Sequence, residues 1–216
     1  MTILYSNGCS YTANLLLPPE QKYPYLLSKR LNWNLQTAAI PGSCNRRIIR
    51  CTIRDCIKLL SNNESIFALI QLTHLSRIEY AGQGNSWRYA KDDMYESLNG
   101  IDHPDNTPLG NDLVRSSFLL HNEHAELTRL MSDLVGLVGF FKQHNIKYLI
   151  YFGSEILVSP TELANDTFYQ YLKQDLGVLD LVGFNMLGLT GEQRHPDKTG
   201  NEIIANYFFN LLDEQA

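Results

Sequence analysis

The chain has 216 residues, of which 44% are hydrophobic and 19% charged, and its net charge at pH 7 is −5. A chain of this length fits one α/β domain and buries roughly 70% of its unfolded surface without a disulfide or a metal to stabilise it. The acidic balance gives no electrostatic footprint for nucleic acid or an anionic membrane, and no apolar run reaches the roughly 18 residues of a membrane span. We expect a single domain over residues 1–216 that binds neither nucleic acid nor a membrane, and we leave its oligomeric state open.

The four cysteines are Cys9, Cys44, Cys51 and Cys56. They form no CxxC pair, and no histidine stands at zinc-finger spacing from them. Two of them fall inside an amphipathic run, where a buried free thiol is the simple interpretation. The residues after Met1 include neither a basic region nor a long apolar region, so they do not look like a signal peptide. These features predict a protein of a reducing compartment, the cytoplasm.

Strands and helices alternate along most of the chain, with short apolar runs for the strands and apolar residues at helical spacing for the helices. In chain order we predict a strand over residues 2–6, a helix over 20–31, a strand over 33–38, a helix over 45–60 and a strand over 65–72. After an interruption there follow a helix over 116–144, a strand over 146–152, a helix over 162–176, a short strand over 178–187 and a helix over 197–213. This alternation predicts the α/β class, as a three-layer α/β/α sandwich with a mostly parallel, flavodoxin-like sheet.

Residues 78–115 interrupt the alternation. They are polar, rich in glycine and asparagine, and contain Trp87, Tyr89 and Tyr95. A loop this long inside a compact domain is usually functional or an insertion. We expect an insertion or lid over the strand ends, in which the aromatic residues either stack on a sugar or form a small core of their own.

The carboxyl ends of parallel strands are where such folds place their sites. Here that rule points to Asn7–Thr12, Ala39–Asn45, Thr73–Arg77 and the loop before the last helix. Ser10, in the sequence Asn-Gly-Cys-Ser-Tyr-Thr, would project over the sheet edge with backbone amides around it. That geometry suits a nucleophile whose own N–H helps to form an oxyanion hole. A plain turn with Ser10 as the helix N-cap, or a phosphate-binding loop, also fits this segment alone.

His195 stands at the entrance of the last helix, and Pro196 and Gly200 follow it. Taken alone, a histidine near a helix start is more often structural than catalytic. Combined with a serine turn after the first strand, it predicts a general base. The reason is chemical, because a serine hydroxyl is a poor nucleophile until a base removes its proton.

In these segments the sequence resembles the SGNH/GDSL hydrolase superfamily, whose four short blocks occur here in order. Gly8–Ser10 matches the Gly-Asp-Ser turn, with cysteine in place of the aspartate. Gly42 matches the glycine whose N–H joins the oxyanion hole. Thr73–His74 stands where the third block has an asparagine. Glu192–Pro196, Glu-Gln-Arg-His-Pro, matches Asp-x-x-His followed by proline, with glutamate in place of the aspartate.

The resemblance implies an ester hydrolase that forms an acyl-serine intermediate and needs no metal or cofactor. Ser10 is then the nucleophile, His195 the base and Glu192 the acid that holds the imidazole tautomer. The remaining candidates, for oxyanion stabilisation or substrate binding, are Gly42, Asn45, Thr73, His74 and Arg77. A missing oxyanion donor costs about 10²–10³ in rate, so the absent asparagine of the third block matters.

Several assignments stay open at this point. Arg46 and Arg77 either hold an anionic group of the substrate or are solvated or paired with acids. Asp197 is the rival of Glu192 as the acid partner, although an acid in the first turn of the last helix is favourable in any case. Cys9 is a possible competing nucleophile, and we expect it to face inward.

The expected substrate is a small acyl ester or an O-acetylated sugar. An SGNH-fold binding module without efficient turnover is the first alternative, favoured by the altered first and third blocks. An acyltransferase that uses the same acyl-serine is the second. Nucleotide binding on a flavodoxin-like sheet is the third.

Overall fold

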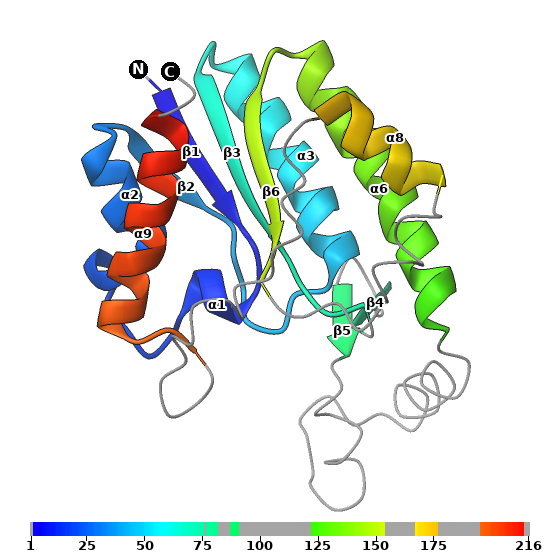
Figure 1. The fold of residues 1–216 in the computed structure, drawn as a ribbon, viewed down its shortest axis with the longest axis horizontal. Coiled ribbons are helices and arrows are strands. Elements are labelled where there is room, and N and C mark those ends of the chain that lie inside the picture. Colours follow the sequence, from blue (N-terminus) through cyan, green and yellow to red (C-terminus); the bar gives the residue numbers. More distant parts are fainter. Residues whose placement is uncertain are drawn as a thin grey trace, which may run out of the picture.

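The structure of the protein is a computed structural model that describes residues 2–75, 77–81, 87–90, 122–153, 167–176 and 195–213. Its first elements are β1 (Thr2–Asn7), α1 (Ser10–Ala13), the 3-10 helix η1 (Pro19–Gln21), α2 (Tyr23–Arg30), β2 (Asn34–Thr37), α3 (Asn45–Ser61) and β3 (Ser65–Leu72). They are followed by β4 (Ile78–Ala81), β5 (Trp87–Ala90), α6 (Glu123–Gln143), β6 (Lys147–Phe152), α8 (Thr167–Leu176) and α9 (Lys198–Asp213) (Figure 1).

Four of the strands form a parallel sheet in the order β2-β1-β3-β6. Its central strands are the apolar ones, since β3 is buried at every position after Ser65. A strand buried on both faces is the expected state of a parallel sheet covered by crossover helices. The four carboxyl ends therefore meet at one edge of the sheet, where α1 begins (Figure 1).

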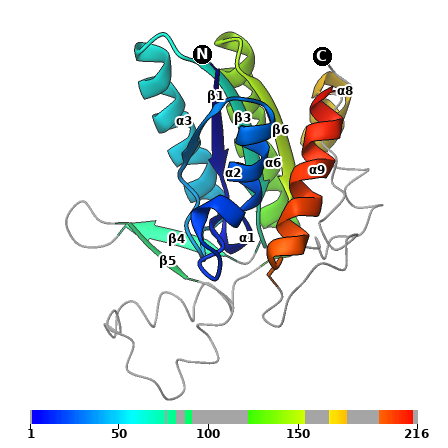
Figure 2. The ribbon, with the colours of Figure 1, turned by 90° about the vertical axis from the view of Figure 1, so that its left-hand side faces the viewer.

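Side chains alternate between the two faces of the sheet and form two separate cores. Tyr5, Ile70 and Ile150 belong to the core under α3 and α6, whereas Leu4, Leu69 and Tyr151 belong to the core under α2 and α9. Figure 1 shows the two groups of helices on opposite sides of the sheet, and in Figure 2 the side with α2 and α9 faces the viewer. This arrangement confirms the predicted three-layer α/β/α sandwich. None of the helices in the described part of the chain is long and apolar enough to cross a membrane.

The start of the 78–115 segment contains two short strands that the sequence analysis did not predict. There β4 and β5 pair antiparallel, with Ile78 opposite Ala90 and Tyr80 opposite Arg88. The short alternation of apolar and polar residues in both strands is compatible with this pairing. Residues 91–115, including Tyr95, lie outside the described residues.

The start of the long helix was predicted too early. α6 begins at Glu123, because Asn122 has an extended backbone and its side chain accepts a hydrogen bond from Ala125 N. An asparagine in that conformation is a favourable N-cap, so the helix begins at the residue after it. The described residues confirm the predicted helix only from 123 onward, and the strand predicted over 178–187 lies outside them.

Candidate active site

Asn7 ends β1 and fixes the turn that follows it. Its Oδ1 accepts a hydrogen bond from Gly8 N at 2.8 Å. Its Nδ2 donates to Ile48 O and to Thr52 Oγ1 on α3, each at 3.0 Å. Because the Asn7 side chain is fully buried, these bonds are not exchanged with water. They fix the direction in which the chain leaves the sheet toward Ser10.

Ser10 is the first residue of α1 and is partly exposed. The N-cap is Cys9, which makes no side-chain capping bond, so the interpretation of Ser10 as the N-cap is wrong. Cys9 is 1% exposed, and its Sγ accepts a hydrogen bond from Gln71 Nε2 at 3.1 Å. The expectation that Cys9 faces inward is thereby confirmed. The turn presents the serine outward and keeps the thiol inside.

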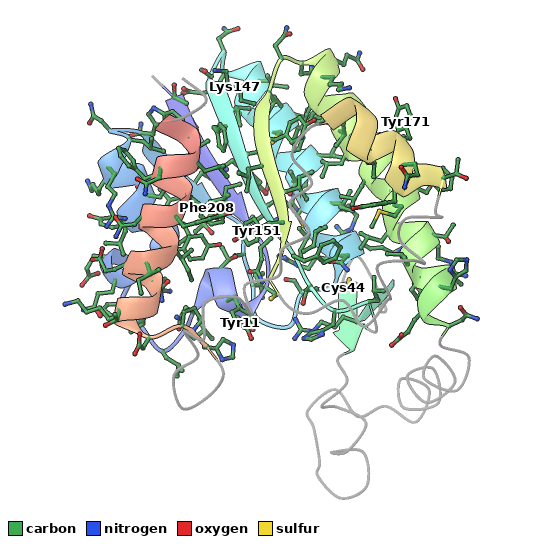
Figure 3. The ribbon with its side chains drawn as sticks, viewed as in Figure 1. Tyr11, Cys44, Lys147, Tyr151, Tyr171 and Phe208 are labelled. Atoms are coloured by element: carbon green, nitrogen blue, oxygen red, sulfur yellow. The ribbon has the colours of Figure 1, made fainter. Side chains whose placement is uncertain are left out.

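A buried hydrogen-bond network lies beneath α1. Gln71 Oε1, from β3, accepts from Thr12 N at 3.1 Å and from Thr12 Oγ1. Thr12 Oγ1 also bonds Tyr23 Oη at 2.7 Å, and Tyr23 Oη bonds Tyr151 Oη. Figure 3 shows Tyr151 on β6 and Tyr11 on α1. Burial is the main cause that raises the pKa of Tyr23 to about 12, so this network stays protonated at neutral pH.

His195 lies against the turn that carries Ser10. Its ring packs on that of Tyr11, the residue after Ser10, with 5.1 Å between ring centroids. The adjacent Pro196 O accepts hydrogen bonds from Asn14 Nδ2 at 2.7 Å and from Asn201 Nδ2 at 2.9 Å. These contacts join the segment after the first strand to the segment before the last helix, as the sequence predicts.

The first turn of α9 holds the segment that carries His195 from the other side. Asn201, which is fully buried, also accepts a hydrogen bond from Tyr23 N at 2.8 Å and so ties α9 to α2. Asp197 Oδ1 accepts from Gly200 N at 2.8 Å, which makes Asp197 the N-cap of α9. Asp197, the alternative to Glu192 as acid partner, is therefore already bonded to its own helix. Glu192 lies outside the described residues.

The loop between β2 and α3, the second loop at this edge of the sheet, carries Gly42. Its φ is 75°, and Ser43 N donates to Ile40 O at 3.2 Å across the turn. A type II turn requires a positive φ at its third residue, here Gly42, and often has proline at its second, here Pro41. A side chain at position 42 would be strained in this conformation. The turn leads directly into α3, at the same sheet edge as α1.

Asn45 joins the second loop to the third loop, which follows β3 and begins at Thr73. Its Nδ2 donates to Thr73 O at 3.0 Å, and its Oδ1 accepts from Thr73 N at 2.8 Å. Arg77 Nη1 in turn donates to Thr73 Oγ1 at 2.7 Å. The Thr73 hydroxyl hydrogen is then left to another acceptor, because a guanidinium can only donate. His74, next to Thr73, is partly exposed.

The two arginines thus differ in their partners. Arg46 lies 3.8 Å from Asp133, and both side chains are substantially exposed, which is the ordinary surface ion pair. Arg77 is bonded to the third loop itself. Its Nε is buried and has no hydrogen-bond partner within the described ranges.

The site depends on three side chains that the sequence did not single out. They are Asn14, Gln71 and Asn201. Gln71 carries a detectable signal, since it is a polar residue inside an apolar strand. Asn14 and Asn201 carry none, because an asparagine beside a short helix or in a helix has no distinctive pattern.

Comparison with known proteins gives matches in structure alone. No family model matches the sequence, and no curated protein matches it. The esterase EstA from Pseudoalteromonas sp. is 16% identical, with a TM-score of 0.56 over 99% of this chain and 97% of that one. A protein from Desulfitobacterium hafniense assigned to the lipolytic G-D-S-L family is 11% identical, with a TM-score of 0.55 over 97% and 98% of the two chains.

The chain has the fold of the SGNH/GDSL hydrolases. A carbohydrate esterase described as having divergent catalytic and non-catalytic binding functions shares this fold. It is 15% identical, with a TM-score of 0.54 over 98% of this chain and 68% of that one. Within this SGNH/GDSL fold, Ser10 begins the helix after β1, and His195 precedes the last helix, α9.

Proposed function

We propose that the chain is a serine-dependent ester hydrolase. The observation that carries the proposal is the contact between the rings of His195 and Tyr11, which sets the imidazole beside the residue that follows Ser10. A base must be within reach of the serine hydroxyl to activate it. The outward Ser10 and the inward Cys9 support serine as the nucleophile.

In this mechanism Ser10 Oγ adds to the acyl carbonyl while His195 takes the hydroxyl proton. The backbone N–H groups of Ser10 and Gly42 stabilise the oxyanion, with Thr73 or His74 as a further donor. His195 then gives its proton to the leaving alcohol, and an acyl-serine remains. Water, activated by His195 in the same way, releases the acid and regenerates Ser10.

The acid partner in the proposal is Glu192, three residues before His195. A carboxylate that accepts Nδ1–H holds the ring orientation and stabilises the imidazolium. The capping role of Asp197 supports this choice, because that carboxylate is already bonded to Gly200 N.

The proposed substrate is a small acyl ester or an O-acetylated sugar. The fold is shared with a carbohydrate esterase, and the 78–115 segment contains aromatic residues of the kind that stack on sugars. We assign this segment the choice of substrate rather than the chemistry. The four buried, unbridged cysteines support a cytoplasmic location.

A binding module with little turnover is the second candidate. It is favoured by the third loop, in which Asn45 and Arg77 bind Thr73 instead of leaving an asparagine amide for the oxyanion. An acyltransferase would use the same acyl-serine with an alcohol in place of water.

Labelling with a fluorophosphonate probe separates these candidates. Phosphonates suit this fold, since the esterase EstA is inhibited by monoethylphosphonate. We expect the probe to modify Ser10, and we expect Ser10→Ala to lose both labelling and hydrolysis of p-nitrophenyl acetate. Ser61→Ala, which removes an exposed serine from the end of α3, is the matched control and should behave like the parent.

Other outcomes point elsewhere. Labelling that survives Ser10→Ala but disappears in Cys9→Ser would assign the nucleophile to the thiol. Absence of labelling together with binding of an acetylated sugar would favour the binding module. A rate that rises when an alcohol acceptor is added, with an ester as product, would favour the acyltransferase.

A further inference from the structure

Helix α1 lacks the capping group that its position calls for. The first N–H groups of a helix have no partner inside the helix, and the N-cap side chain normally accepts from one of them. Here the N-cap is Cys9, which makes no such bond. Thr12 N, the third amide of the helix, instead donates to Gln71 Oε1 at 3.1 Å. The cap of α1 therefore comes from β3, a different element.

The orientation of the Gln71 amide is determined by this contact. A backbone N–H can only donate, so the oxygen of the amide, and not its nitrogen, must face Thr12. The nitrogen then faces Cys9 Sγ, to which it donates at 3.1 Å. One side chain thus binds the residue before Ser10 and the second residue after it.

The hydroxyls behind Gln71 form a chain with one direction. Gln71 Oε1 has no hydrogen, so Thr12 Oγ1 donates to it. Tyr23 Oη must then donate to Thr12 Oγ1, and Tyr151 Oη must donate to Tyr23 Oη. The hydrogen-bond chain that begins at the cap of α1 therefore ends at Tyr23 and Tyr151, in the core under α2 and α9.

The Gln71 side chain occupies space that a side chain at Gly8 or Gly153 would fill. A Cβ on Gly153 would lie 1.9 Å from Gln71 Nε2, and a Cβ on Gly8 would lie 2.7 Å from Gln71 Cβ. Both distances are far inside van der Waals contact. The buried Gln71 side chain therefore lies against the turns that follow β1 and β6.

We propose that Gln71 is the positioning residue of the nucleophile turn. The Gly-Asp-Ser turn of the first block has an aspartate where this chain has Cys9, and aspartate is among the best N-cap residues. In this chain the cap is supplied across the sheet by Gln71, which holds residues 9 and 12 and thereby sets the direction of Ser10 Oγ. This inference rests on the proposed hydrolase function for its kinetic consequences only.

The test is Gln71→Met, which keeps the length of the side chain and removes the amide. A misdirected nucleophile loses rate and not ground-state binding, and a misplacement of about 1 Å costs up to about 10²-fold. We expect kcat for p-nitrophenyl acetate and the rate of fluorophosphonate labelling to fall by about tenfold to a hundredfold, with KM nearly unchanged. The Thr12 amide should also exchange its hydrogen faster, as measured by NMR.

Rescue separates positioning from a general loss of stability. Serine at the N-cap accepts from the amides at the second and third helical positions. Cys9→Ser, added to Gln71→Met, should therefore restore slow Thr12 exchange and most of kcat. Ser28→Ala, which removes another buried hydroxyl that bonds Tyr25 O within α2, is the control and should leave kcat at the parental value.

Three results would overturn the proposal. The first is parental kcat and Thr12 exchange in Gln71→Met. The second is a loss of kcat that Cys9→Ser does not restore. The third is an equal loss of kcat in Ser28→Ala. If Gln71→Met does not fold, Gly153→Ala applies the same test, because the added methyl displaces the Gln71 amide.

A parent protein that the probe does not label would refute the hydrolase function and not the role of Gln71. Thr12 exchange then decides that role alone. Faster exchange in Gln71→Met, reversed by Cys9→Ser, would support it, and unchanged exchange would overturn it.

Discussion

Asn14 allows a direct measurement of how the fold holds His195. Asn14 follows α1 with a φ of 30°, a left-handed conformation that glycine adopts without strain. Asn14→Gly therefore removes little besides the side chain, whose Nδ2 donates to Pro196 O at 2.7 Å. Among the described residues, Asn14 and Asn201 both donate to Pro196 O, next to the proposed base.

The expected cost in stability is small. A buried hydrogen bond contributes about 0.5–1.5 kcal/mol, and the larger penalty arises when a partner is left unsatisfied. Pro196 O keeps its bond from Asn201 Nδ2. Asn14 Oδ1 is itself buried without a partner in the part of the chain that the structure describes, so its removal offsets some of the loss. We expect at most about 1 kcal/mol, or about 2–4 °C in Tm for a chain of this size.

The expected cost in rate is larger, because the backbone of Pro196, next to His195, loses the hydrogen bond from Asn14 Nδ2. We expect kcat for p-nitrophenyl acetate to fall at least about tenfold, as a displaced base costs up to about 10²-fold. The control is Asn63→Gly, the same change at an exposed residue with a φ of 56° between α3 and β3. Thermal unfolding and steady-state kinetics on both variants measure the two effects. Parental kcat in Asn14→Gly, or an equal loss in Asn63→Gly, would refute the reasoning.

Two further predictions concern protons. Burial raises the pKa of Tyr23 to about 12, so its contribution to stability is complete below pH 10, the ordinary value, and is lost as the pH rises toward 12. Tyr23→Phe should weaken the fall of unfolding free energy over this range, by on the order of 1 kcal/mol per pH unit, and an unchanged slope would contradict the assignment. Glu192→Gln should lower kcat more than Asp197→Asn, since asparagine caps α9 as well as aspartate does and loss of the acid partner misorients the base. Equal kcat in Glu192→Gln and the parent would indicate a Ser-His dyad or another acid.

The fold could be predicted wherever apolar pattern and topology agree. Residues 65–72 form a continuous apolar run, and they are the strand β3. The helix over 45–60 begins at Asn45 as predicted and ends one residue later, at Ser61. The parallel sheet then follows from the alternation of elements, and so does the edge at which Ser10 and Gly42 both lie.

The ends of helices and the pairing of short strands are harder to predict from the sequence. The long helix was predicted from residue 116, whereas the extended backbone and the capping bond of Asn122 make α6 begin at Glu123. The hairpin of β4 and β5 was missed because each strand has only four residues, too few for a clear period in a polar segment. Such choices depend on contacts that a local pattern does not contain.

The sequence indicates that Gln71 makes a buried contact, but it does not identify the partner. A glutamine in an apolar strand indicates a buried polar contact, but the strand itself does not say with what. Register supplies the partners: Asn7 pairs with Ile70, so Gly8 and Gln71 follow together, and Gln71 pairs with Tyr151 on the other side. Only then does cysteine in place of the aspartate of the first block acquire a physical explanation. Gln71 supplies the capping acceptor from the neighbouring strand, so the cysteine at residue 9 is no argument against the proposed nucleophile at Ser10.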